Sequence, residues 1–249
     1  KQLFFFALGL LIVFVGGVSF HYRWLAFITM PLYVGQMTLL AAVLSFGQTI
    51  RGTKGWLYLG PVGFQPVEVA KVVLIVLMAK FLATHGRYTK DIRVVIERAV
   101  TVALMLLLVI LQPDLGGAVI LASIWFGTVL ISGLRVRHLL TMFAIAAIFF
   151  VVAWSFLLRP YQKERIMTFM DPTSDPFGRG YNVTQSVIAI GAGQLTGRGI
   201  ASGSQSQLRF LPEARTDFIF SVIAEELGFV GVAILFGLFA MLFQRLYAL

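Results

Sequence analysis

Residues 217–243 read DFIFSVIAEELGFVGVAILFGLFAMLF, a single acidic residue followed by an almost unbroken apolar run. The run is longer than the about 20 apolar residues that a helix needs to cross the hydrocarbon core of a bilayer. Only Glu225 and Glu226 interrupt it with charge, and carboxylates within a membrane span mark paired or functional positions. The stretch therefore predicts a membrane-spanning helix that begins at a carboxylate, Asp217.

The composition extends this prediction to the rest of the chain. Of the 249 residues, 59% are hydrophobic and 12% are charged, whereas an average soluble domain has about 25% charged residues. A soluble domain of this length has too little interior to hide so much apolar surface. Because the chain contains no Cys, it has no disulfide, no thiolate metal site and no Cys nucleophile.

Seven apolar segments are long enough, or nearly long enough, to span a bilayer. They are residues 3–20, 24–46, 67–83, 99–112, 115–132, 139–158 and 218–243. The fourth is short and is separated from the fifth by Pro113, so these two could instead form a re-entrant pair. We predict an all-α polytopic membrane protein with about seven transmembrane helices, forming one domain over residues 1–249.

The basic residues orient these helices. The net charge of +9 comes mostly from short links between apolar runs, which indicates membrane topology and contact with anionic lipid, and no nucleic-acid partner. If seven spans alternate, residues 84–98 and 134–138 fall on one side together with Arg23 and Arg245. The positive-inside rule makes that side cytoplasmic. The opposite, extracytoplasmic side then holds the loop 159–217.

This loop is the longest link in the chain and the first candidate for function. Structureless loops beyond about 12–15 residues are uncommon and are usually functional or disordered. We expect a short interfacial helix at residues 183–190, flanked by Gly-, Pro- and Asp-containing turns. Six of the seven basic residues in the loop are Arg, which favours bidentate contact with phosphate; ordinary headgroup contact is the alternative.

Asp217 is the first candidate for chemistry. A carboxylate fixed at the membrane boundary beside Arg215, a cation that favours its ionised form, is ready to act as a base or to bind a cation. The structural alternative is a helix N-cap. Glu225 and Glu226 lie two turns deeper, where a structural pair to another helix is a simpler explanation than catalysis.

Further polar residues lie within or between the predicted spans. Glu68 and Lys71 are three residues apart and share one helix face, so they form either a self-neutralised pair or part of a site in a cavity. Asp114, before Leu115, indicates a helix cap. Lining of a polar cavity by Gln112 and Asp114 is the alternative.

Several longer motifs, in order along the chain, resemble the shape, elongation, division and sporulation (SEDS) family, which includes RodA, FtsW and SpoVE. The motifs are FQPVEVAK at 64–71, QPDLG at 112–116, FMDPTSDP at 169–176, GYNVTQS at 180–186, IAIGAG at 188–193, LPEARTDFIF at 211–220 and AEELG at 224–228. Residues 205–208, QSQL, together with AEE at 224–226, resemble RodA more than FtsW. The family has ten transmembrane helices, so the resemblance implies that the first and the last two lie outside this chain.

The resemblance also implies a function. Family members polymerise lipid II, an undecaprenyl-diphosphate-linked disaccharide, into peptidoglycan for cell-wall elongation, cell shape and division. The family's essential carboxylate matches Asp217, and its polar pair in the membrane matches Glu68 and Lys71. We expect Asp217 to be the general base that takes the proton of the acceptor hydroxyl. Substrate-binding candidates for the diphosphate or the sugar are Arg198, Arg209, Arg215, Glu68 and Lys71.

Partners and alternatives follow from the same resemblance. It implies a class B penicillin-binding protein as partner, lipid II as substrate and the bacterial cytoplasmic (inner) membrane as location. No cofactor is indicated, although a divalent cation could assist. Two other functions remain open: a lipid II flippase, for which polar residues within the spans are suited, and a non-catalytic scaffold for the penicillin-binding protein.

Overall fold

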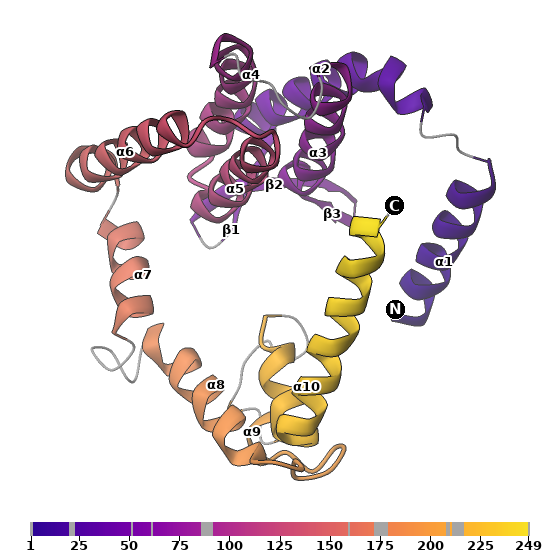
Figure 1. Ribbon diagram of the computed structural model, residues 1–249. Coiled ribbons are helices and arrows are strands. Elements are labelled where there is room, and N and C mark those ends of the chain that lie inside the picture. The colour runs from indigo at the N-terminus through magenta and orange to yellow at the C-terminus, as the bar shows by residue number, and fades with distance from the viewer. Residues whose placement is uncertain are drawn as a thin grey trace. The chain divides into compact units, whose positions relative to one another are not determined.

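The computed structural model describes residues 2–19, 23–50, 52–60, 62–85, 92–158, 160–171, 179–207, 210 and 217–248. The chain divides into two compact units, residues 1–150 and 151–249, each described below by itself. Figure 1 shows that nearly all elements are helices. The longer helices are α1 (Gln2–Ser19), α2 (Arg23–Phe46), α3 (Pro66–His85), α4 (Ile92–Leu111), α5 (Leu115–Ile131), α6 (Val136–Val152), α7 (Pro160–Met170), α8 (Arg179–Gly193) and α10 (Ile219–Ala248).

Each apolar segment predicted from the sequence lies on a helix. The largest difference is α4, which begins at Ile92 and is therefore longer than the segment 99–112 expected from hydropathy. Its 20 residues span about 30 Å at 1.5 Å per residue, the thickness of a hydrocarbon core. The hydropathy signal missed its first turns because Arg93, Glu97 and Arg98 lie there.

Three of these helices are long and apolar enough to cross a membrane by length and composition alone. They are α2 (Arg23–Phe46), α6 together with the π-helical turn Ala153–Leu157 that continues it (span Val136–Phe156), and α10 (Ile219–Ala248). The last two expose large apolar side chains along their length, for example Phe149 and Phe239. Soluble proteins rarely expose contiguous apolar surface on this scale, so the helices belong in lipid and the chain is a polytopic membrane protein.

The first unit has a core where α2, α3, α4 and α5 pack together. Fully buried side chains come from all four helices: Leu40, Leu74, Met105 and Leu121. The helices are also joined by polar contacts, since the Tyr33 hydroxyl on α2 donates to Thr101 O on α4 at 2.8 Å.

A small antiparallel sheet occupies residues 48–64, where the sequence predicted only a link. Its strands β1 (Gln48–Ile50), β2 (Thr53–Leu59) and β3 (Val62–Phe64) pair in sequence order. The prediction of an all-α fold is therefore incomplete in this segment. The strands are three to seven residues long and carry no sustained alternation of apolar and polar residues, so pattern alone did not reveal them.

The sheet is tied to the ends of two helices. The backbone N–H of Lys54 on β2 donates to Gln112 O at 3.1 Å, and the Lys54 ammonium donates to Leu44 O near the end of α2 at 2.5 Å. The buried Gln112 side chain in turn donates to Leu40 O at 3.0 Å. The two Lys54 contacts satisfy carbonyls that helix ends leave free, and the Lys54 cation lies where the α2 dipole is negative. They place the sheet beside the C-terminal ends of α2 and α4.

The opposite ends of the bundle are joined by a different lysine. Lys80, near the end of α3, donates to Ala26 O near the start of α2 at 2.7 Å. The start of α2 and the end of α3 therefore lie at the same end of the first unit.

The second unit is built on close packing of α8 against α10. Small residues face the contact on both helices: Ser186, Ala189 and Gly193 on α8, and Ser221 and Ala224 on α10. Small side chains let two helices approach closely, as in membrane helix pairs generally. The Ser186 and Ser221 hydroxyls are 2.6 Å apart, so a hydrogen bond joins the helices at this point.

Candidate functional site

Asp217 lies in a turn directly before α10, at the position predicted from the sequence. Its side chain is exposed, and within the described part of the chain its carboxylate has no hydrogen-bond or ion-pair partner. It therefore does not cap the described backbone of α10, which was the structural alternative. A carboxylate at the start of a membrane helix that is exposed and has no partner among the described residues is available to receive a proton or bind a cation.

Glu225, two turns further along α10, is in the opposite environment. It is fully buried, and its Oε1 accepts a hydrogen bond from the Gln205 backbone N–H at 2.9 Å. Gln205 belongs to the short helix α9 (Ser204–Gln207). The structural role preferred for Glu225 thus agrees with its contact, although the partner is a loop backbone and not another membrane helix.

Next to Glu225, α10 is broken at Gly228, where φ is 64° and ψ is −163°. Segment 194–199 fills the break. Phe229 and Val230 N–H donate to Gln194 O and Leu195 O, at 2.8 and 3.1 Å. Arg198 and Gly199 N–H donate to Glu225 O and Glu226 O, at 2.9 and 3.0 Å. We call the paired segments 194–199 and 225–230 the kink clasp.

Of the three arginines predicted to bind the diphosphate, only Arg198 lies among the described residues. Its Nη1 donates to Ser204 Oγ at 2.9 Å and its Nε to Ala192 O at 3.3 Å. A guanidinium has five N–H donors, so these two contacts leave capacity for an anion. Arg209 and Arg215 fall outside the described residues.

Glu68 and Lys71 form the pair predicted from their spacing on α3. Lys71 Nζ donates to both carboxylate oxygens of Glu68, at 2.7 and 2.9 Å. The Glu68 side chain is 59% exposed and that of Lys71 21%, so in the described part of the chain the pair is not enclosed. The pair lies in the first unit and Asp217 in the second.

Asp114 is the N-cap of α5. Gly117 N–H donates to its Oδ1 at 2.9 Å, as an N-cap carboxylate requires. Gln112, its predicted neighbour, is buried. Its side-chain amide and its own backbone N–H and C=O groups all form hydrogen bonds to backbone groups. The cap therefore explains Asp114, and the cavity alternative has no support from these contacts.

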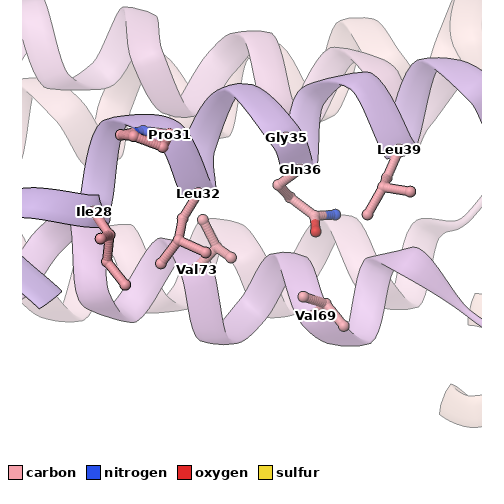
Figure 2. A pocket seen from close by; sticks show the side chains of 8 residues that line it. All are labelled: Ile28, Pro31, Leu32, Gly35, Gln36, Leu39, Val69 and Val73. Atoms are coloured by element: carbon pink, nitrogen blue, oxygen red, sulfur yellow. The ribbon is translucent and has the colours of Figure 1, made fainter. Parts of the chain in front are cut away.

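An open groove of about 570 Å³ lies between α2 and α3. Figure 2 shows its lining, which consists of Ile28, Pro31, Leu32, Gly35, Gln36, Leu39, Val69 and Val73. Gln36 is the one polar side chain of this lining, and its Nε2 donates to Pro66 O at 2.9 Å. An apolar groove without a charged residue can hold a hydrocarbon chain but not a diphosphate, so the anion-binding candidates lie elsewhere.

Sequence reasoning missed the kink clasp. The signal was present in part, because Gly193 and Gly228 both fall in motifs, but spacing alone did not show that residues about 30 apart touch. A Cβ on Gly197 would lie 2.1 Å from Glu226 O, and one on Gly228 2.3 Å from Gly197 N. Only glycine fits at these contacts.

Comparison with curated proteins reveals close relatives. The chain is 42% identical over 219 residues to the peptidoglycan glycosyltransferase MrdB of Escherichia coli K12, covering 86% of this chain and 58% of that protein. It is 41% identical over 214 residues to the probable peptidoglycan glycosyltransferase FtsW of Thiomicrospira cyclica, covering 85% and 54%. The chain thus spans somewhat more than half the length of these relatives.

Solved structures of similar proteins also match this chain. One of them is described as a peptidoglycan synthase complex that coordinates polymerization and crosslinking. The match covers 98% of this chain and 67% of the chain in that structure, with a TM-score of 0.74 at 40% sequence identity. The rod shape determining protein RodA of Thermus thermophilus matches 97% of this chain and 62% of its own, with a TM-score of 0.62 at 32% identity.

The family match covers the whole chain. The sequence model described as "Cell cycle protein", which represents FtsW, RodA and SpoVE, matches residues 1–249. Together with the relatives above 30% identity, this match shows that the chain belongs to the FtsW/RodA/SpoVE family, the SEDS family.

Proposed function

We propose that the whole protein is a peptidoglycan glycosyltransferase that polymerises lipid II into glycan strands for cell-wall elongation and cell shape. Family membership and the names of the relatives support this assignment. The observation that carries the chemistry is the exposed Asp217 carboxylate, which has no partner in the described part of the chain.

The reaction requires one proton to move. The acceptor sugar's 4-hydroxyl attacks the anomeric carbon of the donor, the bond from that carbon to the diphosphate oxygen breaks, and the hydroxyl proton goes to Asp217. The diphosphate is a good leaving group, so it needs cationic stabilisation more than an acid. In our proposal Arg215, Arg209 and Arg198 supply the cations, Glu68 and Lys71 contribute to substrate binding, and a divalent cation could take part.

A lipid-linked substrate places the reaction at the bilayer surface. We propose that the seven apolar segments all cross the bacterial cytoplasmic membrane as one SEDS domain, with residues 159–217 outside. Contacts at the two ends of the first unit support the alternating direction of its helices. Lys54 joins the ends of α2 and α4 on the proposed outer side, and Lys80 joins α3 to the start of α2 on the proposed cytoplasmic side.

We propose a class B penicillin-binding protein as the partner that crosslinks the strands. The support is the similarity to a structure described as a complex that coordinates polymerization and crosslinking. In this proposal the partner binds the whole protein.

The decisive experiment reconstitutes the whole protein in liposomes that carry lipid II in the outer leaflet only. We expect the wild type to make glycan strands without translocating lipid II. Asp217→Asn keeps the shape of the side chain but removes its basicity, so polymer formation should fall by about 10²–10⁴-fold. Glu226→Gln, a charge-matched change on the same helix, is the control.

Two results would contradict the proposal. Activity of Asp217→Asn within about tenfold of wild type would exclude a general base at this position. If no polymer forms but lipid II crosses the bilayer, and Asp217→Asn leaves that crossing unchanged, the protein is a flippase.

Arg215 is the best candidate for the leaving diphosphate because it lies two residues from Asp217 in sequence. Arg215→Ala should lower turnover, and Arg215→Lys should restore part of it, since a lysine keeps the charge but not the bidentate fork. Initial rates on lipid II test this. Equal rates for Arg215→Ala and wild type would remove Arg215 from the site.

A further inference from the structure

The kink clasp joins the loop 194–199 to helix α10 through backbone hydrogen bonds. A break in a membrane helix frees N–H and C=O groups that hydrocarbon cannot satisfy. Here four backbone hydrogen bonds between segment 194–199 and α10 satisfy these groups on both sides of Gly228. A Cβ on Gly197 would lie 2.1 Å from Glu226 O, so loop and helix are in direct backbone contact with no space between them.

Glu225 holds this loop at two points. Its backbone oxygen accepts from Arg198 N–H at 2.9 Å, and its buried carboxylate accepts from Gln205 N–H at 2.9 Å. Between these points the loop closes on itself, because Arg198 Nη1 donates to Ser204 Oγ at 2.9 Å. Residues 198–205 are thus fastened at both ends to one residue of α10.

Asp217 begins the same helix. The clasp therefore fixes the loop that carries Arg198 to the helix that carries Asp217, and both side chains are exposed. A charged group in a low-dielectric interior is costly and persists where it forms good hydrogen bonds. A buried carboxylate that accepts from a loop backbone is well suited to fixing the loop's position.

We propose that Glu225 is a positioning residue for polymerisation: its buried carboxylate holds residues 198–205 against α10, so that the loop and Asp217 keep one fixed geometry. This inference rests on the proposed function. Displacement of a substrate-positioning segment by about 1 Å can lower a rate about 10²-fold without touching the reacting atoms.

The test compares two replacements of similar size in the whole protein. Glu225→Gln keeps an oxygen that can accept from Gln205 N–H, whereas Glu225→Met fills the same space without an acceptor. Glu226→Gln and Glu226→Met are the matched controls, because the Glu226 side chain is only partly buried and its carboxylate has no partner among the described residues. Hydrogen exchange of peptides covering 194–207 and steady-state kinetics on lipid II are measured for each variant.

We expect Glu225→Met to speed exchange in this loop at least about tenfold and to lower kcat by roughly 10–100-fold, with KM for lipid II within about threefold. Glu225→Gln and both controls should stay within about threefold of wild type in exchange and kcat. A residue that serves only stability would lower the yield of folded protein and leave kcat per folded molecule unchanged. If Glu225→Met does not fold, Glu225→Asp, which withdraws the acceptor by one methylene, takes its place.

The outcomes separate the two proposals. Unchanged loop exchange in Glu225→Met, or faster exchange with unchanged kcat, overturns the positioning role while the polymerase activity stands. Loss of activity in Glu225→Gln with an intact loop also overturns it, because the charge and not the hydrogen bond would then matter. A wild-type protein that makes no polymer overturns the proposed function, and the positioning role with it.

Discussion

Asp217 and Glu225 are carboxylates eight positions apart at one end of α10, and their surroundings give them different roles. Asp217 is exposed and uncommitted within the described residues, whereas Glu225 is buried and bonded to Gln205. A buried carboxylate that is already an acceptor is poorly placed to receive a substrate proton. The exposed one is therefore the candidate base and the buried one the structural anchor.

The ion pair between Glu68 and Lys71 should contribute little to stability. Because the two side chains are 59% and 21% exposed, the pair should behave as a surface ion pair, which contributes about 0.2–1 kcal/mol. We expect Glu68→Gln and Lys71→Met each to lower the thermal midpoint of the whole protein only slightly. The charge-swapped double variant should be less stable than wild type, since an acidic residue is favoured in the first turn of α3.

The same variants separate structure from substrate binding. If the pair contacts lipid II, activity will fall much more than stability in Glu68→Gln. Glu97→Gln, an exposed carboxylate on α4, is the control. A stability loss of several kcal/mol would show instead that the pair is enclosed in low dielectric in the whole protein.

At the scale of elements, the break in α10 distinguishes it from an ordinary apolar span. The break needs a left-handed residue and a neighbouring segment that supplies hydrogen bonds, and Gly228 and residues 194–199 provide these. Broken helices are tolerated at membrane depth only where protein satisfies the freed backbone groups. Helix α10 and the loop before it should therefore fold together.

Two glycines of α10 provide a matched pair of variants. Gly228→Ala forces a side chain into a positive φ and against Gly197 N, so we expect it to destabilise the protein by more than about 4 kcal/mol. A Cβ on Gly237 meets nothing within 4 Å, so Gly237→Ala should be neutral or stabilising by roughly 0.5–1 kcal/mol. Thermal unfolding in detergent measures both, and equal midpoints would show that the clasp does not contribute to stability.

At the scale of the whole molecule, orientation in the membrane decides which residues can meet an external substrate. This chain contains no Cys, so an introduced thiol is labelled without background from these residues. Ser202 in the loop and Arg137 in the first turn of α6 are both exposed. We expect a membrane-impermeant maleimide to label Ser202→Cys in intact spheroplasts and Arg137→Cys only after permeabilisation. The reverse pattern would place Asp217 on the cytoplasmic side and contradict the proposed site.

The class of fold and the candidate base were predictable from the amino-acid sequence. Apolar segments of membrane-spanning length are a local property, because each helix satisfies its own backbone and its length is fixed by the bilayer. All seven predicted segments lie on helices, and so does the expected interfacial segment 183–190, within α8. Spacing also predicted the Glu68–Lys71 pair and the Asp114 cap, because residues three apart on a helix or at its start meet through local geometry.

The sheet, the break in α10 and the contact of Glu225 became visible in the three-dimensional structure. The sheet depends on Lys54 reaching Leu44 and Gln112, residues that are 10 and 58 positions away. The clasp depends on residues 194–199 meeting 225–230, which no periodicity in either segment encodes. A buried carboxylate and an exposed one look alike in a sequence, since their difference lies in what packs around them: Glu225 is buried against a loop from elsewhere in the chain, whereas Asp217 is exposed among the described residues.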